Sequence, residues 1–293
     1  GGVSGANCVG GLAGYGGTIT NSYAMGSVTG TGNSIGGLVG GGGTITNSYA
    51  MGSVTGTGNN IGGLVGSGGS VTNSYWDKEK SGQEKSAGGT GLTTEDMKNA
   101  INYSNWDTTN VWYLNGSQTA PLLRSFLTPL TVSAISTTKV YDGSAAAPSG
   151  VSRTPASGPY DPSKVDGTLA WSGNGDAGSY GLTGLYATSQ QGYLINYDSS
   201  ATLTITKKTL TLNSSRVYDG TTAAASSDFT GGIINGVNGQ TLQLSGMGTL
   251  AGKNVGTQSL TSLGTLALAD GTGKASNYTI KDGSVTITAR PLT

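Results

Sequence analysis

The chain has 293 residues, of which 53 are glycine and only 10% are charged. Fifteen basic and fifteen acidic residues give a net charge of zero, so the chain has no basic surplus with which to bind nucleic acid. Histidine is absent, which excludes catalytic triads that need an imidazole and zinc sites that contain histidine. We therefore expect a non-enzymatic protein without catalytic residues, cofactors, metal ligands or a nucleic-acid partner.

The single cysteine, Cys8, has no partner for an intrachain disulfide. No apolar run reaches the roughly 18 residues that a membrane-spanning helix needs, so the sequence predicts no direct membrane insertion. The first residues lack the basic and apolar regions of a secretion signal, and they already fall within a repeat. We interpret the chain as an internal piece of something larger.

Residues 1–76 repeat with a period of 26. The segment TITNSYAMGSVTGTGN occupies residues 18–33 and recurs at 44–59, and SVTNSYW follows at 70–76. Short β-rich stretches alternate with Gly and Asn, and none has helical periodicity, which is typical of stacked coils with about three short strands each. The sequence predicts a short right-handed parallel β-solenoid in which like residues stack on like.

Two rows of side chains are expected along this solenoid. Asn21, Asn47 and Asn73 would form a ladder at one corner, and the tyrosines two positions later would stack beside it. Ile45 and Leu38 are expected to face the interior. The coils contain no charged side chain, so the solenoid face offers no general acid or base.

Residues 77–127 differ from the repeats and are predicted to cap the solenoid, because an open end would expose unpaired strand edges and the apolar interior. Thr93 followed by Asp96 predicts one short helix near residues 94–101. The aromatic side chains here have two interpretations: they fill the core of the cap, or they form a platform on which sugar rings stack. The candidate glycan-stacking residues are Trp76, Trp106, Trp112 and Tyr113.

A longer repeat of about 80 residues follows. KVYDGSAAA at 139–147 matches RVYDGTTAA at 216–224, and alternating strands with Asn-Gly and Asp-Gly turns surround both motifs. These patterns predict two tandem, small all-β domains of sandwich or grasp-like architecture at 128–207 and 208–293. Only Lys207-Lys208 joins them, so we expect a short, stiff joint and modules that lie in line.

The closing strand of each β domain runs into the start of another copy. LTITKKTLT at 203–211 is echoed by VTITARPLT at 285–293. The end of the second β domain therefore resembles the beginning of a third.

The two YDG motifs are candidate structural turns. Their aspartates could ligate calcium, or each could accept hydrogen bonds within its own turn while the glycine is left-handed and the tyrosine ring packs beneath. We favour the second interpretation because no acidic cluster accompanies either motif. The motif residues are Tyr141, Asp142, Gly143, Tyr218, Asp219 and Gly220.

A crosslink from Lys139 to Asn196 would be a further way to stiffen the first β domain. Arg216 occupies the lysine position of the second copy, and a guanidinium cannot form that isopeptide bond. We therefore do not expect the crosslink.

The 26-residue units, with GGLVG and NSYAMGSVTG, resemble GLUG repeats, and the two later units resemble YDG domains of large bacterial surface proteins. Together they are similar to the stalk of filamentous-haemagglutinin-type adhesins exported by two-partner secretion. The resemblance implies an extracellular, outer-membrane-associated adhesin of a Gram-negative bacterium, with this chain as a monomeric fragment of the longer fibre. Its implied role is non-enzymatic attachment to other cells, a host or a biofilm matrix, with extracellular polysaccharide or a host surface glycan or protein as partner.

Two alternatives stay open. The chain is a carbohydrate-binding module that uses the cap aromatics, or it is a non-catalytic segment of a surface protease or glycan lyase. Binding to glycans separates the first alternative from the stalk.

Overall fold

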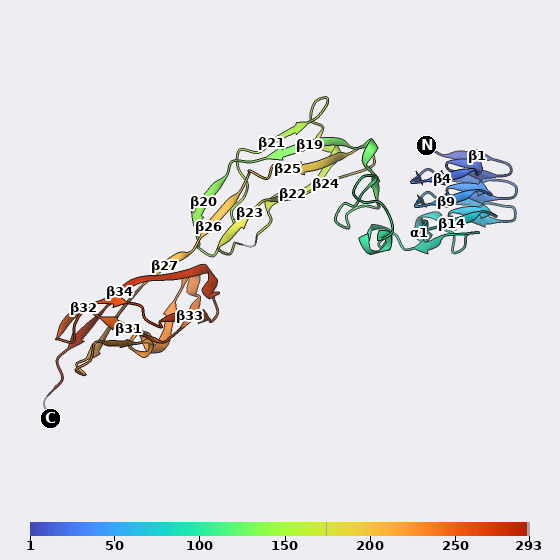
Figure 1. Ribbon diagram of the computed structural model, residues 1–293. Coiled ribbons are helices and arrows are strands. Elements are labelled where there is room, and N and C mark those ends of the chain that lie inside the picture. Colours follow the sequence, from blue (N-terminus) through green and yellow to red (C-terminus); the bar gives the residue numbers. More distant parts are fainter. Residues whose placement is uncertain (174, 292–293) are drawn as a thin grey trace. The chain divides into compact units, whose positions relative to one another are not determined.

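The computed structural model describes residues 1–173 and 175–291, and strands dominate it throughout, which confirms the predicted all-β class (Figure 1). Among these residues the α-helix α1 spans only Lys78–Ser81, and no helix is long and apolar enough to cross a membrane. Leu292 and Thr293, the last residues of the suggested third copy, lie outside the described residues.

The chain divides into two compact units, which we describe separately. Unit 1 comprises Gly1–Thr131, Thr154–Gly167 and Leu185–Asn196; unit 2 comprises Val132–Arg153, Thr168–Gly184 and Tyr197–Thr293. The predicted domain boundaries 1–76, 77–127, 128–207 and 208–293 stay predictions.

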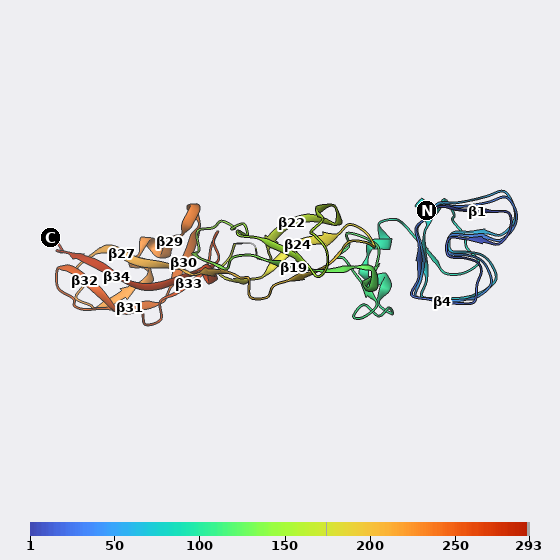
Figure 2. The same cartoon turned by 90° about the horizontal axis from the view of Figure 1, so that it is seen from above.

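Unit 1 begins with a parallel β-solenoid whose coils overlie one another when viewed along the stack (Figure 2). Each coil contributes five short strands, two more than the sequence suggested. Their bounds are β1 (Val3–Gly5), β2 (Val9–Gly10), β3 (Ala13–Tyr15), β4 (Thr18–Thr20), β5 (Tyr23–Ala24), β6 (Val28–Gly30), β7 (Ile35–Gly36), β8 (Val39–Gly41), β9 (Thr44–Thr46), β10 (Tyr49–Ala50), β11 (Val54–Gly56), β12 (Ile61–Gly62), β13 (Val65–Ser67), β14 (Ser70–Thr72) and β15 (Tyr75–Asp77).

The strands pair so that identical repeat positions lie side by side. Ile45 pairs with Ile19 on one side and with Val71 on the other, all three in parallel register. Ile45 and Leu38 are completely buried in the coil interior, as predicted. Threonines flank Ile45 in β9 and alternate with it, so the apolar side chain points inward while Thr44 is exposed.

A partial fourth coil closes the C-terminal end of the solenoid. The β16 strand (Thr90–Leu92) adds to the sheet after β15, and the backbone of Gly63 donates to Lys85 while that of Ala87 donates to Val65. The strand edge at Ile61–Val65 is therefore covered by residues 85–87, not by the later part of the predicted cap.

Residues 93–127 pack along the side of the coils rather than across their end. Tyrosines from three successive coils contact the same aromatic cluster, which contains Met97, Tyr103, Trp106 and Trp112. This segment contains η1 (Asp96–Lys98), η2 (Ala100–Tyr103), β17 (Trp112–Tyr113), β18 (Leu122–Leu123) and η3 (Arg124–Phe126).

The predicted helix at 94–101 is wrong. Thr93 does cap the turn, because its Oγ1 accepts the backbone N–H of Asp96 at 3.0 Å. Asn99 then adopts an extended conformation with ψ 116°, so the segment splits into the short 3₁₀ turns η1 and η2. Within the described residues the single α-helix lies earlier, at α1, where the side chain of Asp77 accepts the N–H of Lys80.

Residues 128–206 form three small sheets with strand orders β21-β19-β25, β20-β26-β23 and β22-β24. Their bounds are β19 (Thr128–Ser133), β20 (Thr137–Val140), β21 (Ser152–Pro155), η4 (Pro162–Lys164), β22 (Val165–Trp171), β23 (Gly178–Tyr180), β24 (Leu182–Ala187), β25 (Tyr193–Tyr197) and β26 (Leu203–Thr206). In this segment β20 pairs in parallel with β26, from Thr137 opposite Leu203 to Val140 opposite Thr206.

The last β domain, in unit 2, is a sandwich of a five-stranded sheet, β27-β34-β32-β31-β28, and a three-stranded sheet, β29-β30-β33. Leu212 and Val285 of the first sheet and Leu244 of the second share one buried core. The bounds are β27 (Lys208–Val217), β28 (Ala223–Ala225), η5 (Ser226–Asp228), η6 (Thr230–Gly232), β29 (Ile233–Asn235), η7 (Val237–Gly239), β30 (Thr241–Ser245), β31 (Met247–Leu250), β32 (Gly256–Ser262), β33 (Ala267–Asp270), η8 (Ala275–Asn277) and β34 (Tyr278–Thr288).

Candidate functional site

Three of the four aromatic residues proposed as a sugar platform fill the core. Trp112 is completely buried, and Trp76 and Trp106 are each 5% exposed. Trp76 lies inside the coils, whereas Trp106 and Trp112 lie between the coils and residues 93–127. Tyr113 is half-buried, and the guanidinium of Arg124 lies over its ring at 5.4 Å. The structure thus decides between the two interpretations in favour of core filling, because no ring face of the three tryptophans is open to a ligand.

The polar atoms of these rings are also engaged. The indole of Trp106 donates to the backbone carbonyl of Asn73 at 2.8 Å, and the hydroxyl of Tyr49 donates to that of Pro121 at 2.8 Å. Burial raises the pKa of Tyr49 well above its ordinary value. These bonds tie residues 93–127 to the coils at fixed points.

The predicted row of Asn21, Asn47 and Asn73 lies at one corner of the solenoid, with no hydrogen bonds between its amide groups in the part of the chain that the structure describes. Asn21, Asn47 and Asn73 occupy the left-handed region with φ of 49°, 48° and 47°, one per coil, so they shape the corner. No hydrogen bond joins their amide groups among the described residues, and the buried Oδ1 of Asn47 has no partner. Their backbone shapes the corner, and Oδ1 of Asn21 also accepts the indole N–H of Trp112 at 3.3 Å.

Two other rows carry hydrogen bonds from coil to coil. The backbone N–H of Asn33 donates to Oδ1 of Asn7 at 2.7 Å, and that of Asn59 donates to Asn33 in the same way. A serine row runs beside the tyrosines, where the N–H of Ser48 donates to Oγ of Ser74 at 3.1 Å. Sequence reasoning missed both rows, although Ser22, Ser48 and Ser74 recur at the 26-residue period and so carried a signal.

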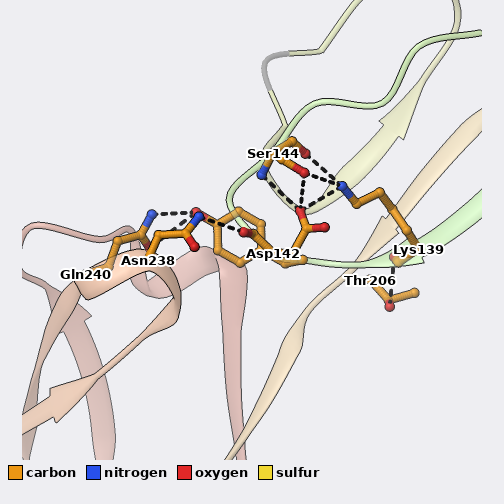
Figure 3. A network of polar contacts seen from close by, with 7 residues as sticks. Lys139, Asp142, Ser144, Thr206, Asn238 and Gln240 are labelled. Atoms are coloured by element: carbon orange, nitrogen blue, oxygen red, sulfur yellow. Dashed lines mark hydrogen bonds and ion pairs between the residues drawn. The ribbon is translucent and has the colours of Figure 1, made fainter.

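The first YDG turn is a compact polar network (Figure 3). Oδ1 of Asp142 accepts the ammonium of Lys139 at 2.7 Å and both the N–H and the hydroxyl of Ser144. These hydrogen bonds hold the pKa of the Asp142 carboxyl below its ordinary value, with the Lys139 contact as the largest cause. Gly143 is left-handed with φ 76°. The aspartate therefore serves its own turn, and the ammonium of Lys139 is committed to this turn rather than to Asn196.

The second YDG turn has the same internal geometry. Oδ1 of Asp219 accepts the N–H and the hydroxyl of Thr221 at 2.9 and 3.1 Å, and Arg216 forms an ion pair with the other carboxylate oxygen at 3.2 Å. The bond from the Thr221 backbone is the largest cause of the lowered pKa of Asp219. Gly220 has φ 79°. Arg216 thus performs at this turn the role that Lys139 has at the first.

The two turns differ in what covers them. Tyr141 is 5% exposed, and within unit 2 it lies against Tyr278. Gln240 links the two hydroxyls: it accepts from Tyr278 at 2.6 Å and donates to Tyr141 at 3.0 Å. Asn238 donates to the backbone carbonyl of Asp142 at 2.9 Å (Figure 3). The first turn is therefore docked on a loop about 100 residues later, a relationship that sequence spacing could not indicate.

A second polar contact in unit 2 joins the same parts of the chain. The carboxylate of Asp176 pairs with Lys274 at 2.5 Å and accepts from Asn277 at 2.8 Å. Oδ1 of Asn277 in turn accepts the N–H of Ala177 at 2.7 Å. Asn277 and Tyr278 form the Asn-Tyr motif of the second repeat, so this motif serves as a docking platform.

A cavity of about 210 Å³ in unit 1 lies beside the buried aromatics. Tyr49 and Met51 of the coils, Lys80 and Lys98, and Gln190 are among the residues that line it. Lys98 is paired with Glu95 at 2.8 Å. The cavity combines apolar walls with ammonium and amide donors, which suits a small polar ligand.

No cluster of three or more His, Cys, Asp or Glu that could hold a metal ion occurs within residues 1–173 and 175–291.

Comparison with known families finds a match for one part of the chain. The model of the YDG domain matches residues 199–287. No curated protein and no solved structure matched the chain. Residues 199–287 thus carry the YDG domain that the repeated Tyr-Asp-Gly motif indicated.

Proposed function

We propose that this chain is a non-enzymatic stalk segment of a bacterial surface adhesin, in which the β domains transmit tension between the cell and an attached surface. The proposal includes an extracellular, outer-membrane-associated location in a Gram-negative bacterium and export by two-partner secretion. The resemblance of the coils to GLUG repeats supports the adhesin context, and the YDG match supports the identity of the last β domain.

The observation that carries the proposal is the pairing of the first and last strands of that domain. Strands β27 and β34 run parallel, with Lys208 opposite Tyr278 at one end and Val217 opposite Thr288 at the other. A force applied through the two ends of the domain pulls these strands past each other along their length. All the hydrogen bonds of the ladder then resist together, because none can open without sliding the whole strand.

The connection to the preceding strand delivers the force directly. Strand β26 ends at Thr206 and β27 begins at Lys208, so Lys207 alone separates them. Strands β20 and β26 are also parallel. The shear geometry therefore occurs both in the β20–β26 pair before this connection and in the β27–β34 pair after it. Only one residue connects the two pairs.

Single-molecule force spectroscopy on the full chain, held at its two ends, tests the proposal. We expect a resistive unfolding event that releases residues 208–288, or roughly 290 Å of contour length at about 3.6 Å per residue. The matched control moves the handles to cysteines at Lys207 and Ser276 in a Cys8→Ser background. These handles adjoin the neighbouring ends of β27 and β34, so the same ladder opens one bond at a time.

The control must unfold at a clearly lower force than the end-to-end geometry. Equal forces in the two geometries would mean that the parallel ladder does not determine mechanical resistance. The tension-bearing stalk would then lose its physical basis.

A second candidate function, carbohydrate binding, is favoured by the cavity beside Tyr49. A glycan array probed with the full chain tests it, with acidic glycans expected among the ligands because Lys80 and Lys98 line the cavity. Lys80→Met should abolish that binding, whereas Lys253→Met, an exposed lysine far along the chain, should leave it unchanged. Array binding that both variants retain would exclude this cavity as the binding site.

A further inference from the structure

The two YDG turns differ sharply in the space around their glycines. A Cβ atom added to Gly143 would lie 2.7 Å from Nδ2 of Asn238, so the Asn238 side chain would have to move away from the turn. A Cβ atom added to Gly220 would meet only the hydroxyl of Tyr218, at 3.8 Å. Both glycines have the same left-handed φ, so the second turn has the conformation of a docked turn without a docked neighbour.

The tyrosines show the same contrast. Tyr141 is 5% exposed and Tyr218 is 36% exposed, although each donates its backbone N–H to the last residue of the adjacent closing strand, Thr206 or Thr288. An aromatic ring held at the rim of a domain by a preformed turn is a typical anchor for an interface. The exposed ring of Tyr218 therefore needs a partner surface like the one that covers Tyr141.

The surface that covers Tyr141 defines the chemistry of that partner. It supplies the edge-to-face ring of Tyr278, the side-chain amide of Gln240 between the two hydroxyls, and an amide donor from Asn238 to the turn carbonyl. All three come from one face of the YDG domain at 199–287.

We propose that the turn Tyr218-Asp219-Gly220 is a docking site for a further YDG-type domain in the same chain, which would cover it as the Asn238, Gln240 and Tyr278 face covers the first turn. Continuity with an interface already formed in unit 2 favours this occupant. The echo of LTITKKTLT by VTITARPLT also favours it, because the strand that closes the YDG domain leads into another opening-strand sequence.

The inference does not depend on the response to force, and its test is separate. Residues 207–291 are duplicated and attached directly after Thr288, which reproduces the one-residue spacing found between Thr206 and Lys208. Hydroxyl-radical footprinting then measures the solvent accessibility of individual tyrosine side chains by mass spectrometry. In the 293-residue chain we expect Tyr218 to react several-fold faster than Tyr141.

In the extended chain Tyr218 should be protected about sevenfold, the ratio of the 36% and 5% exposed fractions of the two rings. Asn238→Ala together with Gln240→Ala, made only in the appended copy, should restore its reactivity while Tyr141 stays protected. These residues lie in the η7 loop and at its end, outside the domain core, so the appended copy should still fold. Tyr218 that reacts as fast in the extended chain as in the original one would overturn the proposal.

Discussion

Tyr141 lies edge to face against Tyr278, with ring centroids 5.3 Å apart, and Gln240 hydrogen-bonds both hydroxyls. The pair joins the first YDG turn to the platform of the second repeat within unit 2. Its counterpart, Tyr218, has the same turn but no such platform. A comparison of Tyr141 with Tyr218 therefore shows how much docking contributes to the stability of a YDG turn.

Replacing Tyr141 with alanine should destabilise unit 2 by about 3 kcal/mol, because a nearly buried aromatic ring is lost and Gln240 is left with an unsatisfied amide. Tyr218→Ala in the same chain should cost about 1 kcal/mol or less, since the ring is already partly hydrated. Urea unfolding followed by circular dichroism measures both. Equal destabilisation by the two substitutions would contradict the docking role of Tyr141.

The solenoid core should not tolerate a charge. Ile45→Asp places a carboxylate between the apolar residues of the neighbouring coils, with no cation in reach, and should lower the free energy of unfolding by several kcal/mol. Thr44→Asp is the control, because that side chain is exposed on the same strand. A melting temperature that Ile45→Asp leaves unchanged would disprove the buried position of Ile45.

The serine row should contribute measurably to the stacking of the coils. Ser74→Ala leaves the completely buried backbone N–H at Ser48 without an acceptor, which should cost about 1–3 kcal/mol. Ser53→Ala removes a hydroxyl from an exposed position and should be nearly neutral. Thermal unfolding compares the two variants, and a neutral Ser74→Ala would show that this bond is dispensable.

The first YDG turn should weaken in acid. The folded-state pKa of Asp142 lies below that of an unfolded chain, about 3.9, so its contribution to stability is present above that pH and is lost as the pH falls toward the folded pKa. Asp142→Asn should flatten the decline in stability below about pH 4, whereas Glu84→Gln, at an 81% exposed side chain, should not. Carboxyl NMR titration checks the direction, and an Asp142 pKa at or above 3.9 would refute it.

The repeats made the solenoid predictable. Because residues 18–33 and 44–59 are identical, each stacked position must suit its own copy, and inward residues such as Ile45 follow from alternation alone. The YDG turns were predictable for a similar reason, since Asp142 and Asp219 act on residues only two positions away. Local hydrogen bonding and exact periodicity are both visible in one sequence.

Contacts between distant segments were not predictable. From the sequence alone, Trp106 and Trp112 could form a sugar platform or fill the core, and only their burial against the coils decides between the two. Gln240, which hydrogen-bonds the hydroxyl of Tyr141, lies 99 residues away in a segment without a repeated motif. The helix predicted near residues 94–101 does not form, because Asn99 is extended with ψ 116° and interrupts the turn that Thr93 caps.

The two rows of coil-to-coil hydrogen bonds run in opposite directions along the stack. In the serine row each coil donates to the coil that follows, as Ser48 does to Ser74, whereas in the asparagine row each coil donates to the coil that precedes, as Asn33 does to Asn7. Every internal coil therefore gives and receives one bond on each row. Duplication or loss of one whole 26-residue unit leaves the remaining coils able to form both rows, while an insertion that is not a multiple of 26 residues shifts the repeat positions that form them. Recombination between the repeats of such a gene would therefore change the length of the solenoid in steps of one coil height, ~4.8 Å.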